Sequence, residues 1–399
     1  YHGQDDRSLQ LSGKGYAKIR QTYNKRGLLV KEIFYNEEEG EEVPAYRTEY
    51  MAAGIDYEYS DDGNLICEIY KDAQDQPVNR HDGGFAMKFR EFENGKLAKI
   101  HYKGYKDGIL QDVPNKEYGI GSVQYFYANG HQVEERYFDI DGNPVLRSDQ
   151  GYSVKKLEYN NRGMVAAYLY YGTDGELILR KDEGYAVIRY EYDELGRVVL
   201  HHYYGVDQEP IISTEYCCFG MQYQYDQRGN RNSIRYLDEN KNLMTRSDLG
   251  YAGINRKYNA DGKLVEVHYF DSEEHPVEGK EKGYAFYKGV YEGKNLVRVE
   301  YRDRYDKLVA NIDTGYAIAA YKYNDQGKCI WENYFDKNVQ PVISKKYHCA
   351  GFRRADNEEN NQEIIGYLGL HGETIIRNDL GYAQVMKQYD DYGNLTGET

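Results

Sequence analysis

The sequence predicts an all-β protein, an elongated β-hairpin repeat solenoid of about twelve units of about 33 residues each. Two observations support this prediction. A small set of residues recurs at one fixed spacing, and the segments between turn signals alternate apolar and polar residues with a period of two. A third observation, 46 tyrosines in 399 residues beside few aliphatic side chains, indicates what holds the units together.

The first mark of the repeat is a proline or leucine followed by an apolar residue. Over most of the chain this pair recurs every 32 or 33 residues. The pairs are Pro144-Val145, Leu177-Ile178, Pro210-Ile211, Leu243-Met244, Pro276-Val277, Leu308-Val309 and Pro341-Val342. A regular recurrence of this length indicates a stack of similar structural units.

The second mark is a glycine followed by an aromatic residue, the Gly-aromatic step, which occurs eight times on the same phase. Six of these steps continue with Ala and reach a second Tyr seven residues after the first, as Tyr185 and Tyr192 do. Together the marks predict one continuous array over residues 1–399, with residues 1–14 as the end of a preceding unit. The predicted units start near residues 15, 51, 84, 119, 151, 184, 217, 250, 283, 315, 348 and 381.

Each unit is predicted to be extended, although repeats of similar length can also be helical. A turn signal appears about every ten residues, which leaves no room for amphipathic helices. Val265, Val267 and Tyr269 fall on one face of a strand. The turn is written Tyr-Asp/Asn-x-x-Gly, as in Tyr192 to Gly196, where Asp caps the backbone and Gly supplies a positive φ. A unit is therefore one hairpin followed by a Pro-Val strand fragment.

Four units lack the Gly-aromatic step, and three of these combine a Tyr directly before the predicted unit start with a Gly three residues after that start. These tyrosines are Tyr50, Tyr216 and Tyr347. In the simpler interpretation, this earlier Tyr fills the same groove. In the alternative, the small side chains that follow it leave a bend or a ligand notch.

Tyrosine is the residue predicted to hold adjacent units together. A single hairpin is marginally stable in water, so each unit must bury its apolar face on its neighbours. A Tyr ring covers a large area while its hydroxyl ends in water or on a carbonyl. The tyrosines of the Gly-aromatic step are therefore expected to form an internal ladder. The alternative is a row of exposed rings that stack on sugars or on an extended polymer, with candidate binding residues Tyr152, Tyr185, Tyr251, Tyr284, Tyr316 and Tyr382.

The sequence predicts no catalytic site, metal site or cofactor. It lacks the nucleophile elbow, the phosphate-binding loops and the zinc-protease motif. His201 and His202 are adjacent and so point to opposite faces of a strand. Five cysteines without C-x-x-C spacing argue against a disulfide framework or structural zinc. The segment from Asp139 to Asn143 resembles a calcium loop but lacks its terminal Glu.

Charge and hydropathy exclude some partners. The formal net charge of −15 argues against nucleic acid and against an anionic membrane surface. No apolar run approaches the ~18 residues of a transmembrane helix, so no membrane insertion is expected.

The turn sequence Tyr192-Asp193-Glu194-Leu195-Gly196-Arg197-Val198 resembles the tyrosine-aspartate (YD) repeats of Rhs-type bacterial proteins. The segments 225–230 and 389–395 are similar, and the hairpins also resemble variant MORN-like repeats. The resemblance implies a bacterial, often secreted or surface-exposed, β-rich scaffold. Encapsulation of a toxin is not implied, because the chain has neither a cleavage motif nor a toxin-like tail.

These features predict a non-enzymatic repeat scaffold or binding module that presents a tyrosine-rich, acidic surface to a glycan or a protein. An extracellular or cell-surface location follows from the resemblance. The alternative is the non-catalytic repeat region of a larger secreted enzyme or toxin, because the chain starts without Met and stops inside its last unit. Ligand identity, oligomeric state and solenoid handedness stay open.

Overall fold

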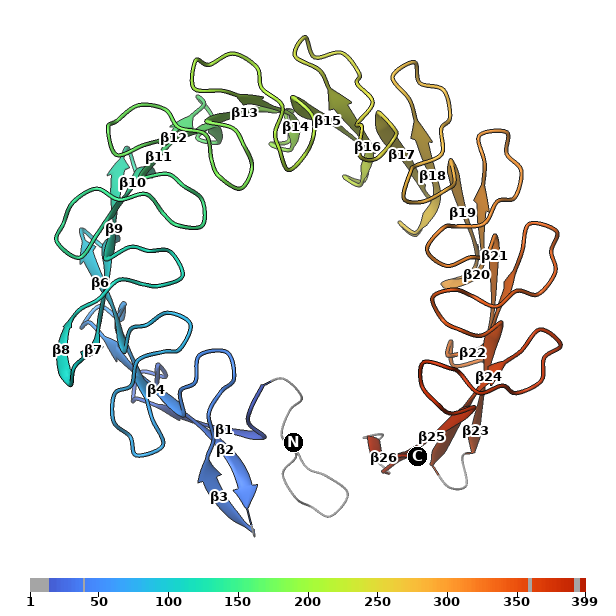
Figure 1. The fold of residues 1–399 in the computed structure, drawn as a ribbon, viewed down its shortest axis with the longest axis horizontal. Coiled ribbons are helices and arrows are strands. Elements are labelled where there is room, and N and C mark those ends of the chain that lie inside the picture. Colours follow the sequence, from blue (N-terminus) through green and yellow to red (C-terminus); the bar gives the residue numbers. More distant parts are fainter. Residues whose placement is uncertain (1–13, 39, 358–360, 391–394) are drawn as a thin grey trace. The chain divides into compact units, whose positions relative to one another are not determined.

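The computed structural model describes residues 14–38, 40–357, 361–390 and 395–399. These residues form β-strands, turns and loops, without any helix in the described ranges (Figure 1). The 26 strands belong to one antiparallel sheet. The predicted all-β architecture of repeated hairpins is confirmed, whereas the proposed end of a preceding unit lies almost wholly outside the described residues.

The strands are β1 Lys18–Tyr23, β2 Leu29–Glu38, β3 Glu41–Pro44, β4 Gly54–Tyr59, β5 Leu65–Lys71, β6 Met87–Glu93, β7 Lys96–Lys106, β8 Ile109–Asp112, β9 Ser122–Ala128, β10 His131–Phe138, β11 Val154–Tyr159, β12 Val165–Tyr171, β13 Val187–Tyr192, β14 Val198–Tyr204, β15 Gly220–Tyr225, β16 Arg231–Leu237, β17 Gly253–Tyr258, β18 Leu264–Phe270, β19 Phe286–Glu292, β20 Asn295–Arg302, β21 Ile318–Tyr323, β22 Cys329–Phe335, β23 Gly351–Asn357, β24 Gln362–Leu368, β25 Gln384–Tyr389 and β26 Leu395–Glu398. The first strand of every hairpin begins three residues after the start that the sequence predicts for its unit, from residue 18 for the first unit to residue 384 for the last.

Contacts divide the chain into two compact parts. The N-terminal part comprises residues 1–190 and 203–215, and the C-terminal part comprises residues 191–202 and 216–399. Each part contains the same kind of hairpin, and each hairpin pairs its second strand with the first strand of the next. That residues 1–399 form a single domain stays a prediction.

The hairpin of β17 and β18 shows how a unit is built. Asn259 begins the turn, and its Oδ1 accepts the backbone N–H groups of Asp261 and Lys263. Gly262 closes the turn with a φ of 75°, a conformation that costs glycine nothing. The strands then pair with Ile254 opposite Tyr269. The Tyr-Asp/Asn-x-x-Gly signature is therefore a side-chain-capped hairpin turn, as predicted.

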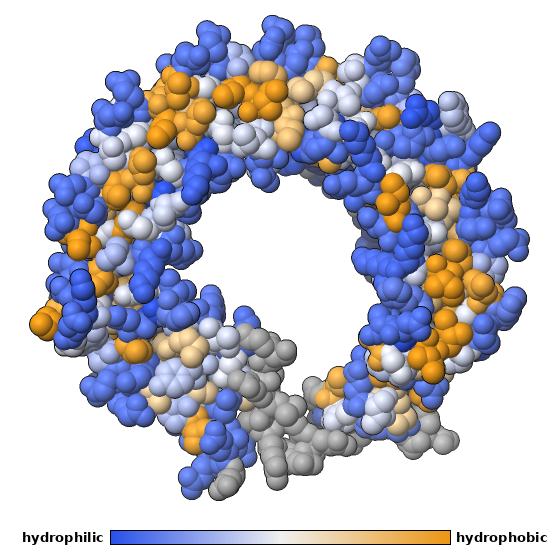
Figure 2. All heavy atoms as spheres, viewed as in Figure 1, coloured by the Kyte–Doolittle hydropathy of each residue, from blue (hydrophilic) through white to orange (hydrophobic). Residues whose placement is uncertain are grey.

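Alternation of side chains gives the sheet two different faces. We call the face that carries Ile254, Tyr269 and their counterparts the ladder face, because buried aromatic rings line it. The other face, which carries His268 and Phe270, is called the second face. In Figure 2, apolar residues form a band over the strands, and hydrophilic residues of the loops border it on both sides.

Two predictions about the strands need correction. The Pro-Val segment makes only a single bridge to the end of the second strand, as Phe270 does with Pro276. Proline has no N–H to continue a ladder, which limits the pairing. In addition, β3 and β8 extend two hairpins with a short strand that was not predicted. Asp107 and Gly108, both with positive φ, form the tight turn before β8.

Candidate functional site

The tyrosines of the Gly-aromatic step lie mostly inside the protein. Tyr152 and Tyr185 are 3% exposed, Tyr316 is 5% exposed, and Tyr251 and Tyr284 are 7% exposed. Tyr382, in the last unit, is 38% exposed. The sequence proposed these six residues as one group, but only Tyr382 offers a substantial ring surface to a ligand.

The buried rings form an aromatic ladder along the ladder face. Six of the eight rings of the Gly-aromatic step each lie between the rings of two second strands, which belong to successive hairpins. The Tyr251 centroid is 6.0 Å from that of Tyr236 and 4.7 Å from that of Tyr269. Tyr284 continues the series at 5.7 Å from Tyr269 and 4.6 Å from Tyr301. Offset and edge contacts at these distances stabilise aromatic pairs beyond the area they bury.

Two of the units without a Gly-aromatic step continue the ladder with the earlier Tyr. The Tyr50 ring is 5.5 Å from Tyr70, and the Tyr347 ring is 5.5 Å from Tyr334. Met51 and His348 then take the positive φ, 53° in both, that glycine has in regular units. The simpler interpretation, an earlier Tyr that fills the same groove, is confirmed at these two sites.

A charged clamp that the sequence analysis did not identify accompanies the ladder. Five units place an Arg-x-Asp segment before the buried ring: Arg80/Asp82, Arg147/Asp149, Arg180/Asp182, Arg246/Asp248 and Arg377/Asp379. The Arg180 Nε and Nη2 donate to the two Asp182 carboxylate oxygens at 3.0 and 2.6 Å. The Arg180 guanidinium also lies 5.0 Å from the Tyr170 ring centroid. The signal was present in the sequence as a recurrent Arg-x-Asp-x-Gly followed by Tyr or Phe.

The Tyr that ends the first strand fastens each hairpin to the one before it. The Tyr225 hydroxyl donates to the backbone carbonyl of Val198 at 2.9 Å. Equivalent bonds join Tyr59 to Leu29, Tyr159 to Gln132, Tyr258 to Arg231 and Tyr323 to Leu296. The second recurrent Tyr of the sequence pattern thus connects successive units through its hydroxyl.

Burial keeps the potentially reactive side chains in their neutral forms. It raises the pKa of the Cys67 thiol to about 12 and that of the Cys218 thiol to about 11. Burial lowers the pKa of His201 to about 4, with smaller contributions from His202 and Arg231. All five cysteines are free thiols. Thiols with raised pKa values are poor nucleophiles at neutral pH.

The segment that resembles a calcium loop is a capped turn. Asp139 Oδ1 accepts the backbone N–H groups of Asp141 and Asn143, so it caps a turn. No group of three or more His, Cys, Asp or Glu residues with metal-binding geometry occurs in the described part of the chain. The same residues include no helix that is long and apolar enough to cross a membrane.

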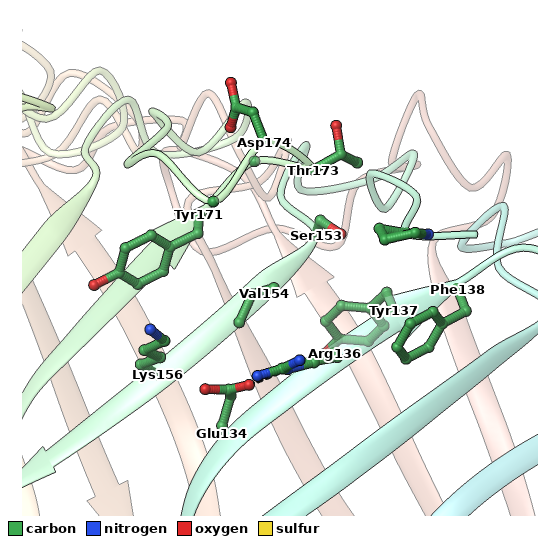
Figure 3. A pocket seen from close by; sticks show the side chains of 13 residues that line it. Glu134, Arg136, Tyr137, Phe138, Ser153, Val154, Lys156, Tyr171, Thr173 and Asp174 are labelled. Carbon is green, nitrogen blue, oxygen red and sulfur yellow. Dashed lines mark hydrogen bonds and ion pairs between the residues drawn. The ribbon is translucent and has the colours of Figure 1, made fainter. Parts of the chain in front are cut away.

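A groove of about 290 Å³ lies on the second face of the N-terminal part (Figure 3). It crosses β10, β11 and β12, where Arg136, Val154 and Tyr171 are neighbours in adjacent strands. Phe138 and Tyr171 lie on opposite sides of Val154 (Figure 3). The turn from Gly172 to Gly175 forms one rim.

The charged groups of the groove are nearly balanced. Glu134 binds Arg136 as an ion pair, and Glu134 is also opposite Lys156 in the register of β10 and β11. The Lys156 ammonium lies 4.5 Å from the centroid of the Tyr171 ring. Asp174 Oδ1 accepts the backbone N–H of Glu176. The groove therefore combines two aromatic rings with both hydrogen-bond donors and acceptors.

Comparisons with known proteins identify no family for this chain. No family model and no curated protein matches it. Among solved structures, it is similar to a TcdB2-TccC3-TEV crystal structure with 11% identity over 96% of this chain and 22% of that chain, at a TM-score of 0.29.

Two other solved structures are similar to this chain at comparably low sequence identity and TM-score. The Photorhabdus luminescens Tc holotoxin pore has 11% identity over 96% of this chain and 26% of that chain, with a TM-score of 0.19. A porin-like protein from Bacteroides uniformis has 8% identity over 87% and 92% of the two chains, with a TM-score of 0.15. The chain spans about a quarter of the Tc-toxin chains that it matches. These TM-scores are too low to establish a shared fold.

Proposed function

We propose that this chain is a non-catalytic repeat scaffold whose second face binds a glycan or a protein at an extracellular or cell-surface location. The proposal rests on one observation: the residues that recur from unit to unit hold neighbouring hairpins together. Tyr, Arg and Asp recur in the units, and the ladder, the clamp and the interhairpin hydroxyl bonds use them to join each hairpin to its neighbours. Such residues maintain a framework, which leaves recognition to residues that differ between units.

The proposed binding surface differs from the one expected from the sequence. The rings at positions such as Tyr251 and Tyr284 are buried, so they cannot form an exposed row. The second face instead carries charged side chains and half-buried rings such as Tyr171. Net charge is −15, so the ligand is expected to be neutral or basic rather than a polyanion.

Substitution in the ladder tests the framework role. Tyr251→Ala removes a ring with two aromatic neighbours and is expected to destabilise its part of the chain by about 3–5 kcal/mol. Hydrogen exchange of the amides in β16 to β18 measures the loss locally. Tyr305, which is 75% exposed, supplies the control, because Tyr305→Ala should leave exchange unchanged. Equal protection in the two variants would contradict the framework role.

Binding and turnover test the rest of the proposal. Glycan arrays and protein pull-downs with the intact chain should yield a ligand that is recovered chemically unchanged. Cleavage or modification of that ligand by the purified chain would overturn the non-catalytic role. The alternative, a repeat region of a larger secreted enzyme or toxin, stays a prediction that the flanking gene sequence can test.

A further inference from the structure

We propose that the groove across β10, β11 and β12 binds one ring of a neutral, hexose-type glycan. This inference rests on the scaffold role proposed above and assigns one ligand to one site. Three features meet in this unit, and together they form the groove. They are the residue after the buried ring, the fourth residue of the turn after β12, and the lysine in β11.

The first feature is an unpartnered hydroxyl. Ser153 occupies the slot that is alanine in most regular units, where Ala186, Ala252, Ala285 and Ala317 are fully buried. Ser153 is also 0% exposed, and its Oγ has no hydrogen-bond partner. A buried hydroxyl without a partner is costly and uncommon. Ser153 lines the groove, and Figure 3 shows it below Thr173. Its hydroxyl is therefore a buried hydrogen-bonding group at the groove that the protein itself leaves without a partner.

The second feature is a missing carboxylate. The fourth residue of this turn has a positive φ in nine units, and in three of them it is a carboxylate that binds a cation of the second face. Lys31 binds Asp75 at 2.8 Å, Arg235 binds Glu274 at 2.6 Å, and Lys288 binds Asp306 at 2.7 Å. In the groove the corresponding residue is Gly175, with a φ of 84° and open space around it.

The third feature follows from the second. Lys156 occupies the same position in β11 that Lys288 has in β19, since each is paired with a glutamate of the preceding strand. Because Gly175 has no side chain, Lys156 makes no ion pair with any described residue and rests over Tyr171. The groove thus presents an ammonium group and a hydroxyl that other units either neutralise or lack.

These groups match a neutral sugar. Aromatic rings offer flat apolar surfaces to the C–H faces of a sugar, and Phe138 and Tyr171 supply two of them. Lys156 donates hydrogen bonds, Asp174 accepts them, and Ser153 does both, as vicinal sugar hydroxyls require. A volume of about 290 Å³ lies at the small end of ligand pockets and suits a single ring. The net charge of −15 disfavours an acidic glycan.

The test is titration calorimetry of the intact chain with glucan, mannan and N-acetylhexosamine oligomers, beside oligogalacturonate as an acidic probe. At least one neutral oligomer is expected to bind. Ser153→Ala should weaken its binding about tenfold, the value of one good hydrogen bond. It should leave thermal stability equal or higher, because other units carry alanine in this slot.

Gly175→Asp is the more specific test, since it introduces the carboxylate that Asp75, Glu274 and Asp306 provide at this turn position. It should pair with Lys156 and reduce binding at least tenfold. Gly372 has the same turn position and an equally open environment, so Gly372→Asp controls for the cost of Asp at positive φ. Tyr171→Leu should also weaken binding, whereas Tyr204→Leu, at the matching position of the next hairpin, should not.

The proposal is overturned if no neutral oligomer binds, if oligogalacturonate binds more tightly, or if Ser153→Ala and Gly175→Asp bind as the unchanged chain does. Each of these outcomes leaves the scaffold role intact if another glycan or a protein is still captured unchanged. Turnover of the ligand, by contrast, would contradict the scaffold role while the groove still binds sugar.

Discussion

At the scale of single residues, His201 links stability to pH. Its ring is buried on the ladder face, in the slot that Tyr168 and Ile234 occupy in neighbouring units. Burial lowers its pKa to about 4, whereas an unfolded histidine titrates near about 6.5. Between these values the unfolded chain binds more protons. The stabilising contribution of neutral His201 is therefore complete above pH ~6.5 and decreases as the pH falls toward ~4.

Between pH ~6.5 and ~4, the free energy of unfolding is expected to decrease by about 3 kcal/mol. Urea unfolding at a series of pH values from 4 to 7 measures it. His201→Ile should flatten that pH dependence. His275 is mostly exposed, so His275→Gln should leave the slope unchanged. An unaltered slope in His201→Ile would assign the pH dependence to other groups.

At the scale of structural elements, the Arg-x-Asp clamp is expected to stabilise the segment between two hairpins. Arg180 is 10% exposed, forks onto Asp182 and lies over Tyr170. Arg180→Lys keeps the charge but loses the planar fork and the stacking. We expect it to lower the free energy of unfolding by about 1.5–3 kcal/mol.

Arg304 provides a matched comparison for this substitution. Its Nε and Nη2 also donate to a carboxylate, that of Glu278, but to a single oxygen, and its side chain is 47% exposed. Arg304→Lys should therefore cost less than Arg180→Lys, because exposed ion pairs contribute little. Denaturant unfolding of both variants measures the difference. Equal losses would mean that burial and ring contacts add nothing to the clamp.

The elements predicted correctly from the sequence are those that residues close together in the chain determine. Every first strand begins three residues after a predicted unit start, because the glycine step and the alternating pattern act within a few residues. The turn at Asn259 likewise follows from one side chain and one glycine. The extra strand β8 was missed because its unit departs from the repeat and places an Asp-Gly turn where other units have the proline slot.

The candidate groove could not be predicted in the same way. It depends on Gly175, a residue without a side chain, beside Lys156, which lies on another strand. Neither residue is unusual by itself, and only the register of β10, β11 and β12 brings them together. The Arg-x-Asp clamp is an intermediate case. Its residues recur visibly in the sequence, but their contact with the ladder rings depends on how one hairpin packs on the next.

At the scale of the whole molecule, the buried tyrosines are expected to make the protein less stable at alkaline pH. Burial raises the pKa of ladder-face tyrosines throughout both parts of the chain, to about 12 for Tyr223 and Tyr287. An unfolded tyrosine titrates near about 10. Between the two values the folded chain holds more protons, so stability is complete below pH ~10 and declines as the pH rises through the folded pKa values.

Because many rings share this shift, their ionisation and unfolding should occur together. A titration that follows tyrosinate absorbance together with β-sheet circular dichroism measures both events. The ladder-face rings should ionise in one steep step that coincides with the loss of β structure. Added salt should move this step only slightly, since buried groups are weakly screened. Gradual ionisation of all tyrosines near pH 10, with the sheet intact, would show that the ladder rings are open to solvent.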